Sequence, residues 1–376
     1  MKYAATILVG CVGSLLALGM VMLYSASMGK DGAHYLLMQL AWGGLGLAAC
    51  VAAAALDYRH LKKISGPLLV LSLVLLGLVL VPGVGTRTHG ASRWFRFHGL
   101  QFQPSELAKL ALVIALAHYG ERRQWQMRTF LGGVALPGLM IGATLGLIFE
   151  EPDWGSTILL ATVSVALLLL AGARWTFLVP PVLLGTAGLG ICLWHNPTRI
   201  GRVMAFLHPE QYKDGVGYQA YQAMIALGSG GWTGLGLGNG RQKLGFVPEQ
   251  HTDFILSIIG EELGLVTTLA VAVAFVVLVL CGLYLAWRAR EPFGFLLAVG
   301  VTLLIGLQAL INIGVVTSAL PNKGLPLPFI SYGGSNLVAM LTCVGLLLSV
   351  ARRASEPETA EAADVEDNVV TAVPAA

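Results

Sequence analysis

The longest polar passage in an otherwise apolar chain runs from 231 to 264 and contains Asp253, at the point where a glycine-rich basic segment ends and an apolar helix begins. A carboxylate so placed can accept the proton of a hydroxyl nucleophile, which is the task of a general base. The alternative is that Thr252 or Asp253 only caps the helix that follows. Arg241 and Lys243 precede Asp253, and this cationic approach favours a site that binds an anion.

A second pair of ionisable residues, Glu106 and Lys109, lies three residues apart in a helix predicted to begin at Pro104. This spacing places both side chains on one helix face. Ionisable groups inside a membrane span usually face a cavity or a partner, so the pair is expected to form a wall of a substrate site. A structural ion pair is the alternative. Asp153, before a later span, fits an N-cap and a site residue equally well.

The segment 320–335, LPNKGLPLPFISYGGS, is rich in proline and glycine. Such a composition predicts a compact, non-helical backbone, which membrane proteins tolerate where the backbone borders protein or a cavity. Lys323 and Ser331 are its predicted ligand-facing groups, and a purely structural role is the alternative for Ser331.

No resident cofactor site emerges from the residue patterns. The glycines at 234–240 resemble a dinucleotide-binding pattern, but no strand precedes them, so a nucleotide site is discounted. The five cysteines lack metal-ligand spacing, and an ordering role for His251 is favoured over metal ligation. No metal ligand set and no organic cofactor are therefore predicted, while a divalent cation, Mg or Mn, is left open.

The elements that position these residues are membrane helices. Of the 376 residues, 56% are hydrophobic and only 11% are charged, whereas soluble domains carry about a quarter charged residues. The sequence predicts an all-α integral membrane protein, a polytopic bundle of about ten transmembrane helices. No nucleic-acid-binding pattern is visible. The apolar runs of spanning length occupy about 4–24, 33–55, 67–82, 104–119, 131–149, 156–171, 176–194, 255–287, 293–316 and 334–351.

The orientation follows from basic residues in short loops, which stay in the cytoplasm. They fall on one side of the predicted bundle: Arg59, Lys62, Lys63, Arg122, Arg123, Arg128, Arg174, Arg288, Arg290, Arg352 and Arg353. Both termini are then cytoplasmic, and the large loop 195–254, between the seventh and eighth helices, lies outside. Cations on the outer loops run against the charge bias and predict an anionic ligand there. Residues 354–376 are acidic and lack aromatics, which predicts a disordered cytoplasmic tail.

Four motifs together resemble those of the SEDS family (shape, elongation, division and sporulation) of bacterial membrane proteins. The resemblance extends from the first helix to Arg353. Within the family, the motifs of this chain are more similar to those of the division branch than to those of the elongation branch. The motifs are RWFRFHGLQFQPSELAKLAL at 93–112, EPDWGST at 151–157, GLGLGNGRQKLGFVPEQHTDFILSIIGEELG at 234–264 and PNKGLPLPFISYGGS at 321–335.

The resemblance implies a peptidoglycan glycosyltransferase domain over 1–353 in the bacterial inner membrane, polymerising lipid II, with Asp253 as the catalytic residue. It implies substrate-site roles for Trp94, Glu106 and Lys109, and the candidates to stabilise a leaving diphosphate are Lys109, Lys323, Arg241 and Lys243. Implied partners are a class B penicillin-binding protein and other division or elongation machinery. An elongation-type polymerase, a lipid II transporter and a non-catalytic scaffold are the alternatives.

Overall fold

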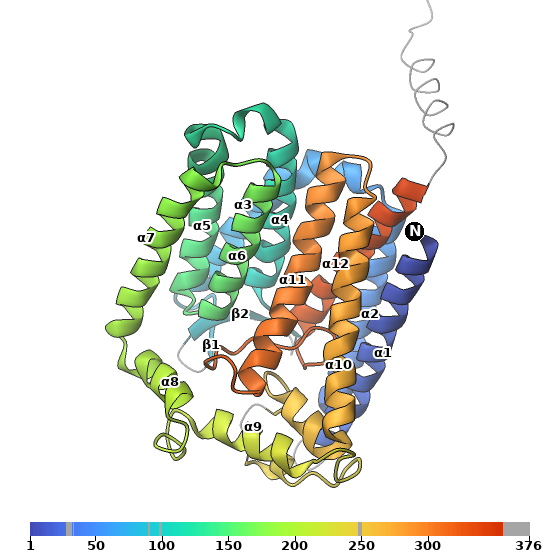
Figure 1. Cartoon of the computed structure of the whole chain (residues 1–376), viewed down its shortest axis with the longest axis vertical. Coiled ribbons are helices and arrows are strands. Elements are labelled where there is room, and N and C mark those ends of the chain that lie inside the picture. Colours follow the sequence, from blue (N-terminus) through green and yellow to red (C-terminus); the bar gives the residue numbers. More distant parts are fainter. Residues whose placement is uncertain (28–31, 33, 89–90, 98–99, 247–249, 356–376) are drawn as a thin grey trace, which may run out of the picture.

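The computed structural model describes residues 1–27, 32, 34–88, 91–97, 100–246 and 250–355. Within these ranges, a bundle of helices spans the molecule, and two shorter helices lie at one end of it (Figure 1). The bundle helices are α1 (Lys2–Ser27), α2 (His34–Ala55), α3 (Leu61–Leu80), α4 (Pro104–Arg122), α5 (Leu136–Glu150), α6 (Trp154–Leu170), α7 (Trp175–Trp194), α10 (Ile255–Trp287), α11 (Pro292–Val316) and α12 (Gly334–Ser355).

The predicted number of about ten spans is confirmed. Within the described residues, eight helical segments are long and apolar enough to cross a membrane, one of them being a π-helical turn, Leu131–Ala135, continued by α5. The shorter α6 and the more polar α4, which carries Glu106, Lys109 and Glu121, complete the bundle. Figure 1 shows the N-terminus and the end of α12 on the same face, as an even number of spans requires.

The opposite face carries the elements that connect the spans. The large loop contains α8 (Pro197–Leu207), α9 (Tyr218–Ser229) and a 3-10 turn at Gln242–Leu244. Between α3 and α4, where the sequence predicts no helix, the chain forms a three-stranded antiparallel sheet of β1 (Thr86–Thr88), β2 (Ala91–Phe97) and β3 (Leu100–Phe102). Its aromatic-rich central strand explains the sheet, because aromatic residues favour pleated strands.

Small residues let the bundle helices approach closely, as is typical of membrane helix interfaces. In the α2–α12 contact, a Cβ on Gly345 would lie 2.3 Å from the carbonyl oxygen of Cys50, and one on Gly46 would lie 2.6 Å from Leu341. Neither glycine can be enlarged unless the two helices separate. These contacts fix α12, which leads directly out of the 317–333 loop.

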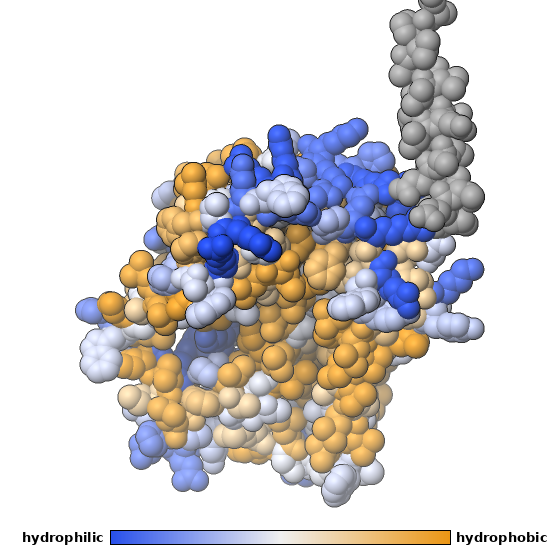
Figure 2. All heavy atoms as spheres, turned by 45° about the horizontal axis from the view of Figure 1, so that its top comes forward, coloured by the Kyte–Doolittle hydropathy of each residue, from blue (hydrophilic) through white to orange (hydrophobic). Residues whose placement is uncertain are grey.

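A network of ion pairs lies at the terminus-bearing face. It joins the 3-10 turn Tyr58–His60 to the start of α3, the end of α4 and the start of α11. Glu291 accepts from Arg59 at 2.5 Å and from Lys62 at 2.9 Å, and Lys62 also pairs with Glu121 at 2.8 Å. Figure 2 shows hydrophilic side chains gathered over this end and hydrophobic ones over the flank. The polar end and apolar flank match a bundle that stands in a membrane.

The first two residues of the predicted tail, 354 and 355, belong to a helix. This helix is α12, which continues through Ser355. The remaining part of that prediction, 356–376, lies outside the described residues.

We predict that Gly345→Ala lowers the free energy of unfolding by about 1–3 kcal/mol, the usual cost of overpacking. The added methyl group meets the backbone of α2, which cannot move aside as a flexible side chain would. Thermal unfolding in detergent measures the change. Gly77→Ala in α3, where nothing lies within 4 Å of the new Cβ, is the control. Equal stability of the two variants would contradict the close α2–α12 contact.

Candidate active site

Asp253 lies in the turn before α10, on the face opposite the termini, and is partly exposed. Its carboxylate rests against Gly324: a Cβ built there would lie 3.1 Å from Asp253 Oδ2. Gly324 has a φ of +58°, so this position favours glycine for its backbone as well as for space. The N-cap position of α10 is Phe254, which makes no capping hydrogen bond through its side chain. The helix start therefore does not place Asp253 at the N-cap.

Two amides on α11 hold the segments that carry Asp253 and Gly324. The side-chain amide of Asn312, buried in the bundle, donates to the carbonyl of Asp253 at 2.8 Å and to that of Leu325 at 2.7 Å. One turn earlier, Gln308 donates to the carbonyl of Pro326 at 2.9 Å. Sequence reasoning did not identify these amides. The signal was present, because two polar residues four apart in an apolar span share one face.

Ser331 joins the same two segments from the loop side, a contact that fits the structural alternative given for it, while its ligand-facing role stays a prediction. Its buried hydroxyl donates to the carbonyl of Thr252 at 2.6 Å and accepts from the N–H of Leu327 at 2.8 Å. The N–H of Tyr332 donates to the carbonyl of His251 at 2.9 Å. The His251 ring stacks on Tyr35 with centroids 4.5 Å apart, in agreement with the predicted ordering role.

Glu106 and Lys109 form a buried ion pair of 2.9 Å, with Lys109 only 1% exposed. Lys109 also donates to Gln308 at 3.2 Å, and Asn336 donates to Glu106 at 3.0 Å. Both charges are enclosed and hydrogen-bonded, which is what makes a buried pair tolerable. The geometry supports the structural alternative over the predicted substrate contact: the pair orients Gln308, which in turn holds the loop.

Helix α10 is interrupted at Gly264, whose φ is +77°. The glycine-rich segment supplies the missing backbone partners: Leu235 donates to the carbonyl of Glu261 at 3.0 Å, and Leu265 donates to that of Gly231 at 2.9 Å. A Cβ on Gly234 would lie only 2.2 Å from the carbonyl oxygen of Glu262. The glycines therefore allow the segment to pack on the broken helix, not on a nucleotide.

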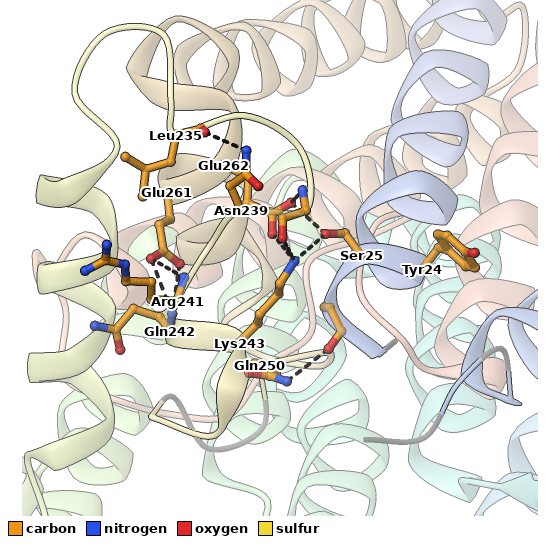
Figure 3. A network of polar contacts seen from close by, with 12 residues as sticks. Tyr24, Ser25, Leu235, Asn239, Arg241, Gln242, Lys243, Gln250, Glu261 and Glu262 are labelled. Carbon is orange, nitrogen blue, oxygen red and sulfur yellow. Dashed lines mark hydrogen bonds and ion pairs between the residues drawn. The ribbon is translucent and has the colours of Figure 1, made fainter. Parts of the chain in front are cut away.

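Side chains of α10 fasten this segment further (Figure 3). Glu262, fully buried, accepts from Lys243 at 2.7 Å, from Ser25 of α1 at 2.7 Å and from the N–H of Gly238 at 3.0 Å. Lys243 also donates to the carbonyl of Gly238 at 2.7 Å and to Ser25 at 3.1 Å. With its three donors engaged, Lys243 fastens this segment in the structure, and its substrate-binding role stays a prediction.

Arg241 differs from Lys243 in its environment. Its backbone N–H donates to Glu261 at 2.8 Å, but its side chain is exposed and points away from the Glu262–Lys243 pair in Figure 3. It remains a candidate cation at the rim of the site.

The acidic turn between α5 and α6 has a structural basis. Asp153 is buried and accepts from the N–H of Ser156 at 3.0 Å, so it is the N-cap of α6, which was one of its two predicted roles; the substrate-site role stays a prediction. Arg93 of β2 donates to the carbonyls of Glu151 at 2.6 Å and Pro152 at 2.7 Å. Burial, with a contribution from the Asp153 charge, raises the pKa of Glu151 to about 8.

Trp94, the other predicted site residue from this region, is half-buried in β2 opposite Thr86. It lies in the hairpin whose neighbouring Arg93 holds the acidic turn. The structure thus places Trp94 in a supporting element on the face opposite the termini.

Two cations flank the N-terminus of α6 near this turn. The carbonyl of Lys323 lies against Gly155, where a Cβ would come within 2.9 Å of it, and the Arg199 guanidinium of α8 stacks 4.0 Å from the Trp154 ring centroid. Burial lowers the pKa of both Lys323 and Arg199. Across the part of the chain that the structure describes, the Lys323 ammonium makes no ion pair or hydrogen bond. A partly desolvated cation on the residue that precedes Gly324 is suited to an anionic ligand.

Among the described residues, no group of three or more His, Cys, Asp or Glu side chains gathers as a metal site would require. The arrangement offers the partly exposed Asp253 carboxylate on a turn that buried amides hold to the 322–327 segment.

We predict that Lys243→Met lowers the free energy of unfolding by about 3–5 kcal/mol, because it leaves the buried Glu262 charge without its partner. Thermal unfolding in detergent checks this. Lys243→Met combined with Glu262→Gln should recover part of the loss. Arg241→Met, at an exposed side chain of the same segment, is the control and should change stability by less than about 0.5 kcal/mol. If Lys243→Met is as stable as the control, the ion pair does not fasten the loop.

Comparison with known proteins identifies relatives over nearly the whole chain. A family model described as a cell cycle protein of the FtsW/RodA/SpoVE type matches residues 5–356. The chain is 41% identical to a probable peptidoglycan glycosyltransferase FtsW of Geobacter metallireducens, over 94% of this chain and 95% of the relative. It is 40% identical to the protein of the same description from Nitrosococcus halophilus, over 94% and 93% of the two chains.

Solved structures show the same fold. A chain from a study of structural coordination of polymerization and crosslinking by a peptidoglycan synthase complex aligns with a TM-score of 0.79 and 31% identity, covering 93% of this chain and 98% of that one. The rod shape determining protein RodA of Thermus thermophilus aligns with a TM-score of 0.69 and 30% identity, covering 93% and 97%. On sequence and on structure alike, this chain belongs to the FtsW/RodA/SpoVE family, which is the SEDS family that its motifs resemble.

Proposed function

We propose that this protein is a peptidoglycan glycosyltransferase that polymerises lipid II into glycan strands. The observation that carries the proposal is the Asp253 carboxylate, partly exposed at one end of the bundle and held beside Gly324. The family relatives described as glycosyltransferases support the reaction class. The basic residues of the terminus-bearing face orient the molecule, with both termini in the cytoplasm and Asp253 at the outer face of the membrane.

The reaction joins two sugars that are each linked to undecaprenyl diphosphate. The C4 hydroxyl of N-acetylglucosamine in lipid II attacks C1 of N-acetylmuramic acid at the end of the growing strand. Asp253 accepts the hydroxyl proton as the new C–O bond forms, because an alcohol is a weak nucleophile at neutral pH. The bond from C1 to the diphosphate oxygen breaks, and its electron pair leaves with the diphosphate. One displacement of this kind inverts C1 and needs no covalent enzyme intermediate.

The leaving diphosphate gains negative charge, which fixed cations stabilise most in a site of low polarity. Lys323 meets this requirement because it adjoins Gly324 and is desolvated. Arg199, stacked on Trp154 across the α6 N-terminus, provides a second cation for the lipid-linked diphosphates. Arg241 contributes from the exposed rim. Lys109 and Lys243 are left out of this role, since each is engaged by a buried glutamate.

In the proposed reaction, side chains of this protein alone accept the proton and stabilise the leaving group. Where Mg or Mn takes part, the proposal is that it arrives bound to the diphosphate of the substrate, since the described residues gather no protein ligand set of their own.

The proposed setting is cell division, with a class B penicillin-binding protein as the partner that crosslinks the new strands. The FtsW relatives support the division role over the elongation role. The similarity to a chain of a peptidoglycan synthase complex supports the transpeptidase partner. Other division proteins and the acidic tail are proposed to act in recruitment.

We predict that Asp253→Asn reduces polymerisation by roughly 10²–10⁴-fold, the usual contribution of a general base. Asparagine keeps the size of the side chain, so lipid II affinity and thermal stability should stay near wild type. Polymer yield from labelled lipid II, measured beside lipid II binding, checks this. Asp214→Asn, the same change at an exposed position of the large loop, is the control. Near-normal polymerisation by Asp253→Asn would overturn the proposed function.

We predict that Lys323→Gln lowers polymerisation by roughly 10²–10³-fold, the scale for losing one fixed donor to developing charge. Lys323→Arg should retain much of the activity. Because burial lowers the pKa of Lys323 below 10.5, the wild-type rate should fall as pH rises through that lowered value. Arginine stays protonated, so the alkaline fall should move to higher pH in Lys323→Arg.

The pH profiles of wild type, Lys323→Arg and the exposed-loop control Lys213→Gln give the comparison. An alkaline limb that is the same in all three would show that Lys323 does not govern it. Normal yield from Lys323→Gln would remove the residue from the site.

A further inference from the structure

An apolar groove of about 400 Å³ opens on the lipid-facing surface, far from Asp253, along the seam between α1 and α10. Its walls are the first two turns of α1, with Tyr3, Ala4 and Ile7, and the last turns of α10, with Leu280, Cys281 and Tyr284. Both segments end at the terminus-bearing face (Figure 1). The groove therefore begins at the membrane surface and descends into the hydrocarbon layer.

The mouth of the groove is cationic. The Arg288 guanidinium lies 5.6 Å from the ring centroid of Tyr284, a lining residue, and Lys2 directly precedes the lining residue Tyr3. Both side chains are exposed, and within the described ranges neither forms an ion pair. The nearest acidic residue along the chain, Glu291, is already engaged by Arg59 and Lys62.

We propose that this groove binds an acidic phospholipid, with an acyl chain along the apolar wall and the headgroup phosphate at Lys2 and Arg288. Basic residues at a membrane surface attract anionic lipids, and tyrosines at the same level suit the interface. The length of the groove argues against a partner helix. Its lining covers only residues 1–7 and 277–284, about 10–12 Å along a helix, whereas a transmembrane helix needs a face of about 30 Å.

The test uses the full-length protein, purified in detergent and supplied with phosphatidylglycerol or phosphatidylcholine of the same acyl chains. Native mass spectrometry counts the lipids that each variant retains. Lys2→Gln and Arg288→Gln should each reduce the preference for phosphatidylglycerol about fivefold, since each removes one cation at the surface. Lys63→Gln, at another exposed lysine of the same face, is the control and should leave the preference unchanged.

A second variant tests the groove itself. Cys281→Trp places an indole in the cavity and should reduce retention of both lipids, whereas Leu183→Trp, on an exposed part of α7, should not. Equal retention by the two tryptophan variants, or equal lipid preference in Arg288→Gln and Lys63→Gln, would overturn the proposal. Retention of a protein helix in place of lipid would overturn it as well.

Discussion

The outer end of the molecule depends on one buried amide. Asn312 donates both of its N–H groups to backbone carbonyls, one at Asp253 and one at Leu325, which belong to segments on opposite sides of α11 in the sequence. Asn312 is only 2% exposed, so losing its amide would leave the two carbonyls without this donor inside the bundle. A buried polar group left without its partner costs about 1–3 kcal/mol. The amide therefore fixes the carboxylate-bearing turn and the Lys323–Gly324 backbone at one mutual distance.

The buried charges of the bundle serve this arrangement from two sides. The Glu106–Lys109 pair orients Gln308, which holds the loop at Pro326. Glu262 gathers Lys243 and Ser25, and so ties the glycine-rich segment to α10 and α1. Each pair is enclosed and satisfied, which leaves chemistry to the groups at the rim. Function then needs only a carboxylate that accepts a proton and cations that face a diphosphate.

The fold was largely predictable from the sequence because lipid contact imposes long apolar runs, and the spans begin and end close to the expected residues. The position of Asp253 before an apolar helix was also readable, since the change from polar to apolar composition marks it. It was not possible to read from the sequence which basic side chains are available to bind a ligand. Lys243 meets Glu262 only because the intervening chain folds back on a broken helix, and Ser331 points to Thr252 because of a loop whose path no periodicity describes.

The role of Asn312 was not predictable either. An amide in an apolar helix indicates a buried polar contact, but the sequence does not identify the partner of that contact.

We infer that Asn312 acts on polymerisation through Asp253, and a double-mutant cycle on the polymerisation rate tests this most directly. Asn312→Ala should slow polymerisation while lipid II affinity and membrane insertion stay near wild type. Added to Asp253→Asn, it should cause little further loss, because coupled residues are not additive. Losses that multiply independently in the double variant would contradict the account.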